Sequence, residues 1–60
     1  MKKVRVKRDR LEVRMGPSSE YPTNGEVWKG VEFYIIEEKN GFGRLKSKAG
    51  WVDMKGCEKA

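Results

Sequence analysis

The sequence has no histidine, and we first consider its one cysteine and nine carboxylates as candidates for catalysis. Histidine is the commonest general base and metal ligand in proteins. Cys57 has no activating partner near it in the sequence, and the carboxylates lie beside basic residues or in turns. One cysteine also excludes an internal disulfide and a multi-cysteine metal site. We therefore expect no enzyme, no metal and no cofactor, and we interpret Cys57 as a small buried strand residue.

Aromatic side chains are better candidates for a function, because an exposed aromatic residue beside charge is a common feature of binding surfaces. Alternation along the expected strands places Trp28, Tyr34 and Phe42 on the solvent side, whereas Phe33 and Trp51 are expected to pack in the core. The outward aromatics either are binding residues, or cover the open end of a small barrel or pack beneath the long loop. The same choice applies to Tyr21, which either binds a ligand or anchors a loop.

The net charge of +5 is concentrated at the start of the chain. The first 14 residues contain seven lysines or arginines against Asp9 and Glu12, while the remaining 46 residues hold seven charges of each sign. Lys3, Arg5 and Lys7 form the expected electrostatic patch. Such a patch indicates either a polyanionic partner or a sheet edge that charge protects from pairing with other strands.

The elements that position these residues follow from a short stretch with clear alternation. Leu11 and Val13 are expected to face the core, Glu12 and Arg14 the solvent, and Gly16-Pro17 ends the strand because proline cannot donate to a sheet. A loop then covers residues 18–24. Val4 and Val6 alternate with basic residues in the same way, so we expect residues 3–7 and 11–14 to pair as an antiparallel hairpin.

Turn residues divide the rest of the chain into further short strands. We expect strands at 25–28 and 31–38, joined by residues 29–31, with Val27 opposite Phe33 and Glu26 opposite Tyr34. Ile35-Ile36 breaks the alternation, which indicates a bulge, a bend at a barrel corner or burial on both sides.

Asn40-Gly41 is the strongest hairpin signal in the chain, because these residues accept the positive φ values of a tight turn. The strand at 42–46 follows with Gly43 and Leu45 inward, then a strand at 51–53. Residues 54–60 are expected to form a one-turn helix and a closing strand through Cys57. Sixty residues with this pattern form one small domain, or one module of a longer chain, and can close only as a small barrel or two orthogonal sheets.

The ordered motifs in this chain resemble the bacterial SH3 (SH3b) family, whose members carry a Leu-x-Val-Arg-x-Gly-Pro opening and a closing Gly-Trp-Val. The resemblance covers roughly residues 9–53. The matching residues are Leu11, Val13, Arg14, Gly16, Pro17, Tyr21, Gly25, Val27, Gly30, Phe33, Ile35, Asn40, Gly41, Leu45, Gly50, Trp51 and Val52. The chain differs from the family at Phe42, where tryptophan is usual, and at Gly56-Cys57, where a Tyr-Leu pair is common.

The resemblance implies an all-β, SH3-like barrel of about five to seven short antiparallel strands and a non-catalytic function. SH3b modules bind bacterial cell wall, often the peptide stem or cross-bridge of peptidoglycan, beside an attached lytic domain of an endolysin or autolysin. The implied ligand groove lies next to the loop after Gly-Pro. Its residues here are Arg14, Met15, Ser18, Ser19, Glu20 and Tyr21, with Tyr34 and Phe42 as neighbouring aromatics.

The location implied by the resemblance is the bacterial wall, where the basic patch is expected to attract anionic wall polymers. No apolar stretch after Met1 is long enough for an export signal or a membrane span, so the chain as given is expected to be made in the cytoplasm without a signal of its own. Two other classes remain open. A nucleic-acid binder would combine the basic start with Trp28 or Tyr34, and a protein-interaction module would need an aromatic groove for a proline-rich segment.

Overall fold

Seven short strands and one 3-10 turn make up the computed structural model, which describes all 60 residues. The elements are β1 (Lys2–Val6), β2 (Arg10–Arg14), β3 (Thr23–Trp28), β4 (Glu32–Lys39), β5 (Phe42–Leu45), β6 (Trp51–Asp53), η1 (Met54–Gly56) and β7 (Cys57–Lys59). Every strand pair is antiparallel. The all-β expectation is therefore confirmed, as are the one-turn helix and the closing strand through Cys57.

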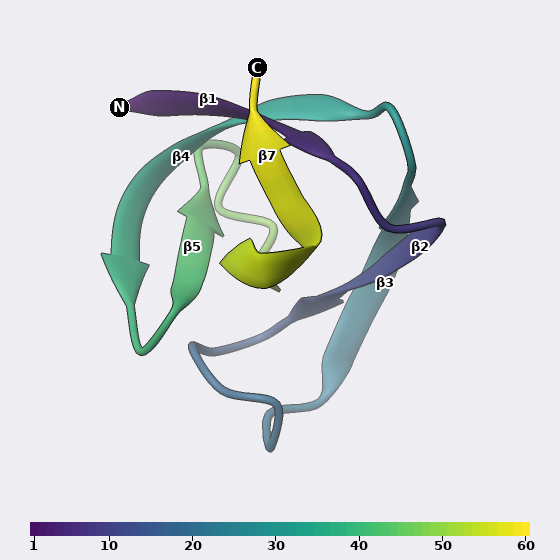
Figure 1. Ribbon diagram of the computed structural model, residues 1–60. Coiled ribbons are helices and arrows are strands. Elements are labelled where there is room, and N and C mark those ends of the chain that lie inside the picture. Colours follow the sequence, from purple (N-terminus) through teal and green to yellow (C-terminus); the bar gives the residue numbers. More distant parts are fainter.

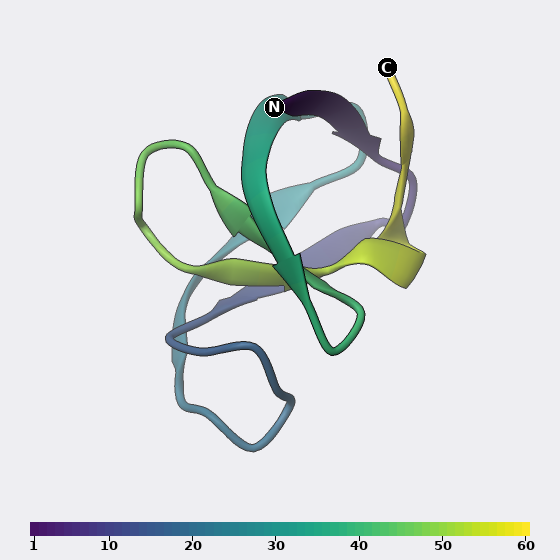
Figure 2. The same ribbon diagram turned by 90° about the vertical axis from the view of Figure 1, so that its left-hand side faces the viewer.

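The strands form one sheet in the order β3-β2-β6-β5-β4-β1-β7, which curls into a small barrel-like fold (Figure 1). Backbone hydrogen bonds join the turn after β3 to the end of β1. Val6 N–H donates to the Val31 carbonyl and Gly30 N–H donates to the Val6 carbonyl, both at 2.9 Å. The loop between β2 and β3 extends from one end of the molecule, and both chain termini lie at the other end (Figures 1 and 2).

The core contains only small aliphatic side chains and one thiol. Its eight buried residues are Val4, Val6, Leu11, Val13, Ile35, Leu45, Val52 and Cys57. The expected inward positions of β1, β2 and β5 are thus confirmed. Phe33 is half-buried and packs against this cluster, as expected, together with Val27 and Met54.

Trp51 is not a core residue, which corrects the sequence-based expectation. Val52 is the buried residue of β6, so alternation turns Trp51 outward, where it is half-buried between two neighbouring strands. Its Cα partners are Arg14 on β2 and Arg44 on β5, and the Arg44 guanidinium lies 5.8 Å from the centre of the indole ring. The tryptophan therefore covers the outside of the sheet.

Strand β4 bends sharply and is shared by the two halves of the sheet (Figure 2). Its first half pairs with β1, from Arg5 opposite Glu32 to Lys2 opposite Ile35, and its second half pairs with β5. The register with β5 shifts between Ile35 and Glu37. The broken alternation at Ile35-Ile36 is thus a β-bulge at a bend, with Ile35 buried and Ile36 exposed.

Two expected strand pairings are wrong. β1 and β2 do not form a hairpin, because β1 pairs with β4 and β7 while β2 pairs with β3 and β6. β3 and β4 do not pair either, so Val27 lies opposite Leu11 and Phe33 lies opposite Val4. The physical reason is that residues 29–31 bond to the end of β1 and thereby close the barrel. Alternation specifies which face is buried, whereas the partner strand depends on how the sheet closes.

The β4–β5 connection forms as expected at Asn40 and Gly41, with φ of 54° and 80°. Gly43 is buried in β5, and a side chain there would collide with the Met54 sulfur and the Ile35 side chain. The glycine therefore lets η1 and β4 approach the backbone of β5 closely.

The adjacent isoleucines provide a matched test of the bend. Ile35 is 2% exposed and Ile36 is 41% exposed. Removing one buried methylene by Ile35→Val should lower the free energy of unfolding by about 1 kcal/mol. Ile36→Val should change it by less than about 0.5 kcal/mol, because its side chain is largely in water. Urea unfolding of both variants measures the difference, and equal losses would contradict the assigned bulge.

Candidate functional site

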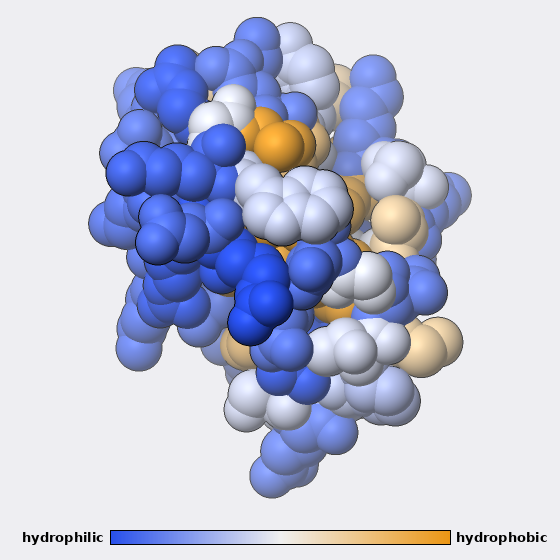
Figure 3. Space-filling view, turned by 90° about the vertical axis from the view of Figure 1, so that its right-hand side faces the viewer, coloured by the Kyte–Doolittle hydropathy of each residue, from blue (hydrophilic) through white to orange (hydrophobic).

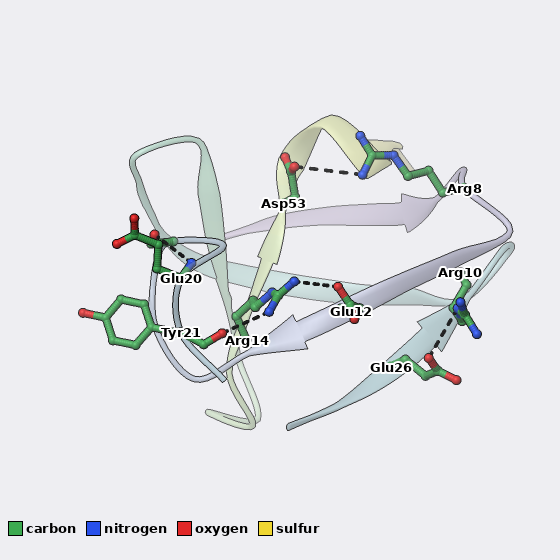
Figure 4. Close-up of polar contacts among 9 residues, drawn as sticks. Arg8, Arg10, Glu12, Arg14, Glu20, Tyr21, Glu26 and Asp53 are labelled. Carbon is green, nitrogen blue, oxygen red and sulfur yellow. Dashed lines mark hydrogen bonds and ion pairs between the residues drawn. The ribbon is translucent and has the colours of Figure 1, made fainter. Parts of the chain in front are cut away.

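The loop between β2 and β3 is held by backbone contacts at its base and by an aromatic ring above them. Met15 N–H donates to the Pro22 carbonyl at 3.0 Å, and Arg14 Nη1 donates to the Tyr21 carbonyl at 3.0 Å. The Tyr21 ring packs directly on buried Gly16, where any side chain would collide with it. The ring points away from the pair formed by Arg14 and Glu12 (Figure 4). This geometry gives Tyr21 a clear part in anchoring the loop.

A hollow of about 350 Å³ lies beside this loop, and we call it the arginine hollow. Three arginines, two carboxylates, one hydroxyl and two apolar side chains surround it. The lining residues are Arg8, Arg10, Leu11, Glu12, Arg14, Ser19, Phe42 and Asp53. They come from β2, from the turn before it, from the long loop and from the β5 and β6 strands that pair at Phe42 and Asp53.

Each arginine of the hollow has a carboxylate partner (Figure 4). Arg14 pairs with Glu12 at 2.6 Å, Arg10 with Glu26 at 3.5 Å, and Arg8 with Asp53 at 3.9 Å. Exposed ion pairs of this kind contribute about 0–1 kcal/mol each. A ligand carboxylate or ammonium group can therefore replace one partner at little cost.

The surface around β2 and β3 is largely hydrophilic, with isolated apolar side chains between the charged ones (Figure 3). Trp28, at the end of β3, is 56% exposed and lies opposite Arg10 on β2. The expected outward position of Trp28 is confirmed, but the expected pairing of its neighbour Glu26 with Tyr34 is wrong, because Glu26 lies opposite Glu12 and β3 and β4 are not neighbours.

The structure brings some of the expected site residues together and separates others. Arg14, Ser19 and Phe42 line the arginine hollow, whereas Met15 and Tyr21 do not. Ser18 and Glu20 shape the loop, since Glu20 N–H donates to Ser18 Oγ at 3.1 Å. Tyr34 lines a different hollow together with Phe33, Leu45, Lys46 and Ser47. Tyr21 and Tyr34 are therefore not the two walls of one groove.

Four charged residues of the hollow were missed in the sequence. They are Arg8, Arg10, Glu12 and Asp53. A signal for two of them was present, because Arg10, Glu12 and Arg14 stand two residues apart on one strand and so project to one side of it. Arg8 lies in the bend before that strand, where alternation does not apply. Asp53 joins them through the pairing of β6 with β5 and β2, which no local pattern specifies.

The expected electrostatic patch is largely neutralised by acids of β4 and β7. Lys3 lies 3.3 Å from Glu32, and Arg5 lies 2.9 Å from Glu32 and 3.4 Å from Glu58. Hydrogen bonds donated by Arg5 and then Lys3 lower the pKa of Glu32. The hydrogen bond that Arg5 donates to Glu32 is also the main cause of the raised pKa of Arg5. Lys7 alone among the patch residues has no ion pair.

The uncompensated positive charge of the molecule belongs to lysines. All five arginines are in ion pairs, and the only carboxylates outside pairs are Asp9 and Glu20. Seven lysines have no carboxylate partner, and seven against two accounts for the net charge of +5. These lysines are Lys7, Lys29, Lys39, Lys46, Lys48, Lys55 and Lys59. The excess is therefore dispersed over the surface and not confined to the first two strands.

Cys57 is buried in the core, as expected for a structural strand residue. Burial is the main cause of a raised pKa for its thiol, which keeps the sulfur protonated and a poor nucleophile near neutral pH. Its Sγ donates weakly to the Asp53 carbonyl at 3.9 Å. No group of three or more acidic, cysteine or histidine side chains is arranged to hold a metal ion.

No helix in the structure has the length and apolar character needed to cross a membrane. Comparison of the chain with models of known protein families, with curated proteins and with solved structures found no match.

Tyr21→Ala tests whether the ring anchors the loop. Loss of the contact with Gly16 should lower the free energy of unfolding by about 1 kcal/mol, the value for partial burial of one ring. Met15→Ala is the matched control, because Met15 lies in the same loop and is more exposed. Thermal and urea unfolding would give the comparison. Full stability of Tyr21→Ala combined with weaker ligand binding would instead support a direct role for the ring in recognition.

The ion pairs of Glu32 predict an acid-dependent loss of stability. Because the pKa of Glu32 is lowered in the folded state, its contribution is present above the ordinary value of 4.5 and is lost as pH falls below it. Glu32→Gln should therefore reduce the stability lost between about pH 6 and about pH 3. Glu20→Gln, which removes an unpaired carboxylate, should leave that loss unchanged. Identical pH profiles for wild type and both variants would refute the effect.

Proposed function

We propose that this chain is a non-catalytic binding module for short peptides of the bacterial cell wall. The observation that carries the proposal is the arginine hollow, which presents guanidinium groups, carboxylates and one hydroxyl beside a long, anchored loop. Wall peptide stems carry carboxylates and, in many cases, free amino groups. A hollow with charges of both signs suits such a zwitterionic peptide better than it suits a uniformly charged polymer.

Each kind of group in the hollow has a role in this proposal. Arg8 and Arg10 would bind a ligand carboxylate, since a guanidinium offers two parallel donors to it. Glu12 and Asp53 would accept from an ammonium group, and Ser19 Oγ would donate to a peptide carbonyl. Phe42 would contact small apolar side chains at the edge. Arg14 would position the loop through its bond to the Tyr21 carbonyl.

A small, open hollow of this kind is suited to modest affinity. That is sufficient for a module tethered to a second domain, because the tether raises the effective concentration of the enzyme at an insoluble substrate. We therefore propose that the module holds an attached lytic domain on the wall. The unpaired lysines would add a weak attraction to anionic wall polymers that is screened within about 8 Å at physiological ionic strength.

Pelleting with purified Gram-positive walls tests the proposal. Wild type should pellet with the walls and release no soluble wall fragments. Arg8→Gln and Arg10→Gln should each weaken binding by about tenfold, as expected for loss of a charged hydrogen bond to a ligand. Arg44→Gln is the matched control, because Arg44 is also ion-paired, to Glu37, but does not line the hollow.

Two results would contradict the proposal. Equal weakening by all three substitutions would show that only net charge matters, and the hollow would not be the site. Release of soluble wall fragments by the chain alone would show that it is an enzyme. Titration with a synthetic stem peptide can be monitored by NMR. Shifts in the signals of Ser19 and Phe42 would place the bound peptide in the hollow.

A further inference from the structure

A second surface, separate from the arginine hollow, combines an exposed aromatic ring with two ammonium groups. Tyr34 is 43% exposed, and the Nζ atoms of Lys3 and Lys46 lie 5.9 Å and 5.7 Å from the centre of its ring. Lys3 is the cross-strand partner of Tyr34 on β1, and Lys46 N–H donates to the Tyr34 carbonyl at 2.9 Å from the other side. We call these three residues the Tyr34 row.

The Tyr34 row borders a shallow hollow of about 420 Å³ with an apolar floor. Phe33 and Leu45 supply the floor, and Tyr34, Lys46 and Ser47 form its sides. None of these residues lines the arginine hollow. The surface therefore offers a place for a flat apolar group, with Lys46 and a hydroxyl at its rim and Lys3 near the Tyr34 ring.

The lysines of the Tyr34 row are not fully neutralised by carboxylates, so they can bind an anion. Lys46 has no carboxylate partner, and neither does Lys48 two residues later. Lys3 has one partner, Glu32, which it shares with Arg5. Cation–π contacts at exposed positions are weak, so both ammonium groups can leave the ring for a phosphate without a large loss.

We propose that the Tyr34 row binds single-stranded nucleic acid. One base stacks on the Tyr34 ring over the apolar floor, and the ammonium groups of Lys3 and Lys46 contact the phosphates on either side of it. An aromatic platform flanked by cations is the arrangement that recognises unpaired bases without strong sequence preference. An anionic polymer without bases would use the lysines but would leave the ring without a role.

Fluorescence anisotropy with a labelled oligothymidylate at low ionic strength tests this proposal. Wild type should bind, and Tyr34→Ala should weaken binding by about tenfold, within the range found when one stacking residue is removed. Tyr34→Phe should keep most of the affinity because the ring remains. Trp28→Ala is the matched control, since Trp28 is more exposed but has no lysine over its ring, and it should have no effect.

The charged part of the row is tested by a second pair of variants. Lys46→Glu should weaken binding more strongly than Lys55→Glu, which makes the same charge change at an unpaired lysine away from Tyr34. The comparison of Lys46→Glu with Lys55→Glu still tests the proposal if Tyr34→Ala fails to fold. Circular dichroism checks the fold of each variant. A strand of abasic phosphodiester units should bind wild type and Tyr34→Ala equally.

Several outcomes would overturn the proposal. Absence of oligonucleotide binding by wild type would do so, as would equal effects of Tyr34→Ala and Trp28→Ala. A loss on the abasic strand as large as that on the oligothymidylate would show that Tyr34 does not stack on a base. Because Tyr34, Lys3 and Lys46 are absent from the arginine hollow, wall binding should be unaffected by Tyr34→Ala, so the two proposals can fail independently.

Discussion

The bend in β4 is the constraint on which the rest of the structure depends. β4 is the strand that joins β1 and β7 to the four strands on its other side in the sheet. The eight residues of β4 can pair with strands on both sides because the bulge after Ile35 turns the second half of the strand toward β5. Ile35 lies at that corner, pairing with Lys2 and with Leu45, and its side chain reaches the closed interior.

Local alternation in the sequence was sufficient to identify the strands and their buried faces. Val4, Val6, Leu11, Val13 and Leu45 all face the core as the pattern indicates, and Asn40-Gly41 forms the expected turn. Strand partners were harder to predict, because pairing depends on contacts between distant segments. The pairing of β1 with β4 and β7 could not be read from neighbouring residues. Trp51 lies outside the core although its side chain is large and aromatic, because alternation along β6 makes Val52 the buried residue.

The candidate site was partly predictable for the same physical reason. Arg14, Ser19 and Phe42 line one hollow, while Tyr34 lies elsewhere because its half of β4 pairs with β1. Charge counted along the chain was also a poor guide to charge on the surface. The basic residues of β1 lie beside Glu32 and Glu58, which come from segments far away in sequence. Cross-strand pairs of opposite charge support the sheet.

The pairing of β1 with β7 has a consequence for how the molecule reaches this structure. Val4 lies opposite Lys59 and Val6 lies opposite Cys57, so residues from the two ends of the chain must meet before the core is covered. Contacts of such high sequence separation carry the largest loop-closure cost, and barrels of high contact order fold slowly for that reason. During synthesis, the edge of β1 that pairs with β7 has no partner until Cys57–Lys59 has left the ribosome. Its alternating lysines and arginines then oppose aggregation, because a strand with this charge pairs poorly with another copy of itself.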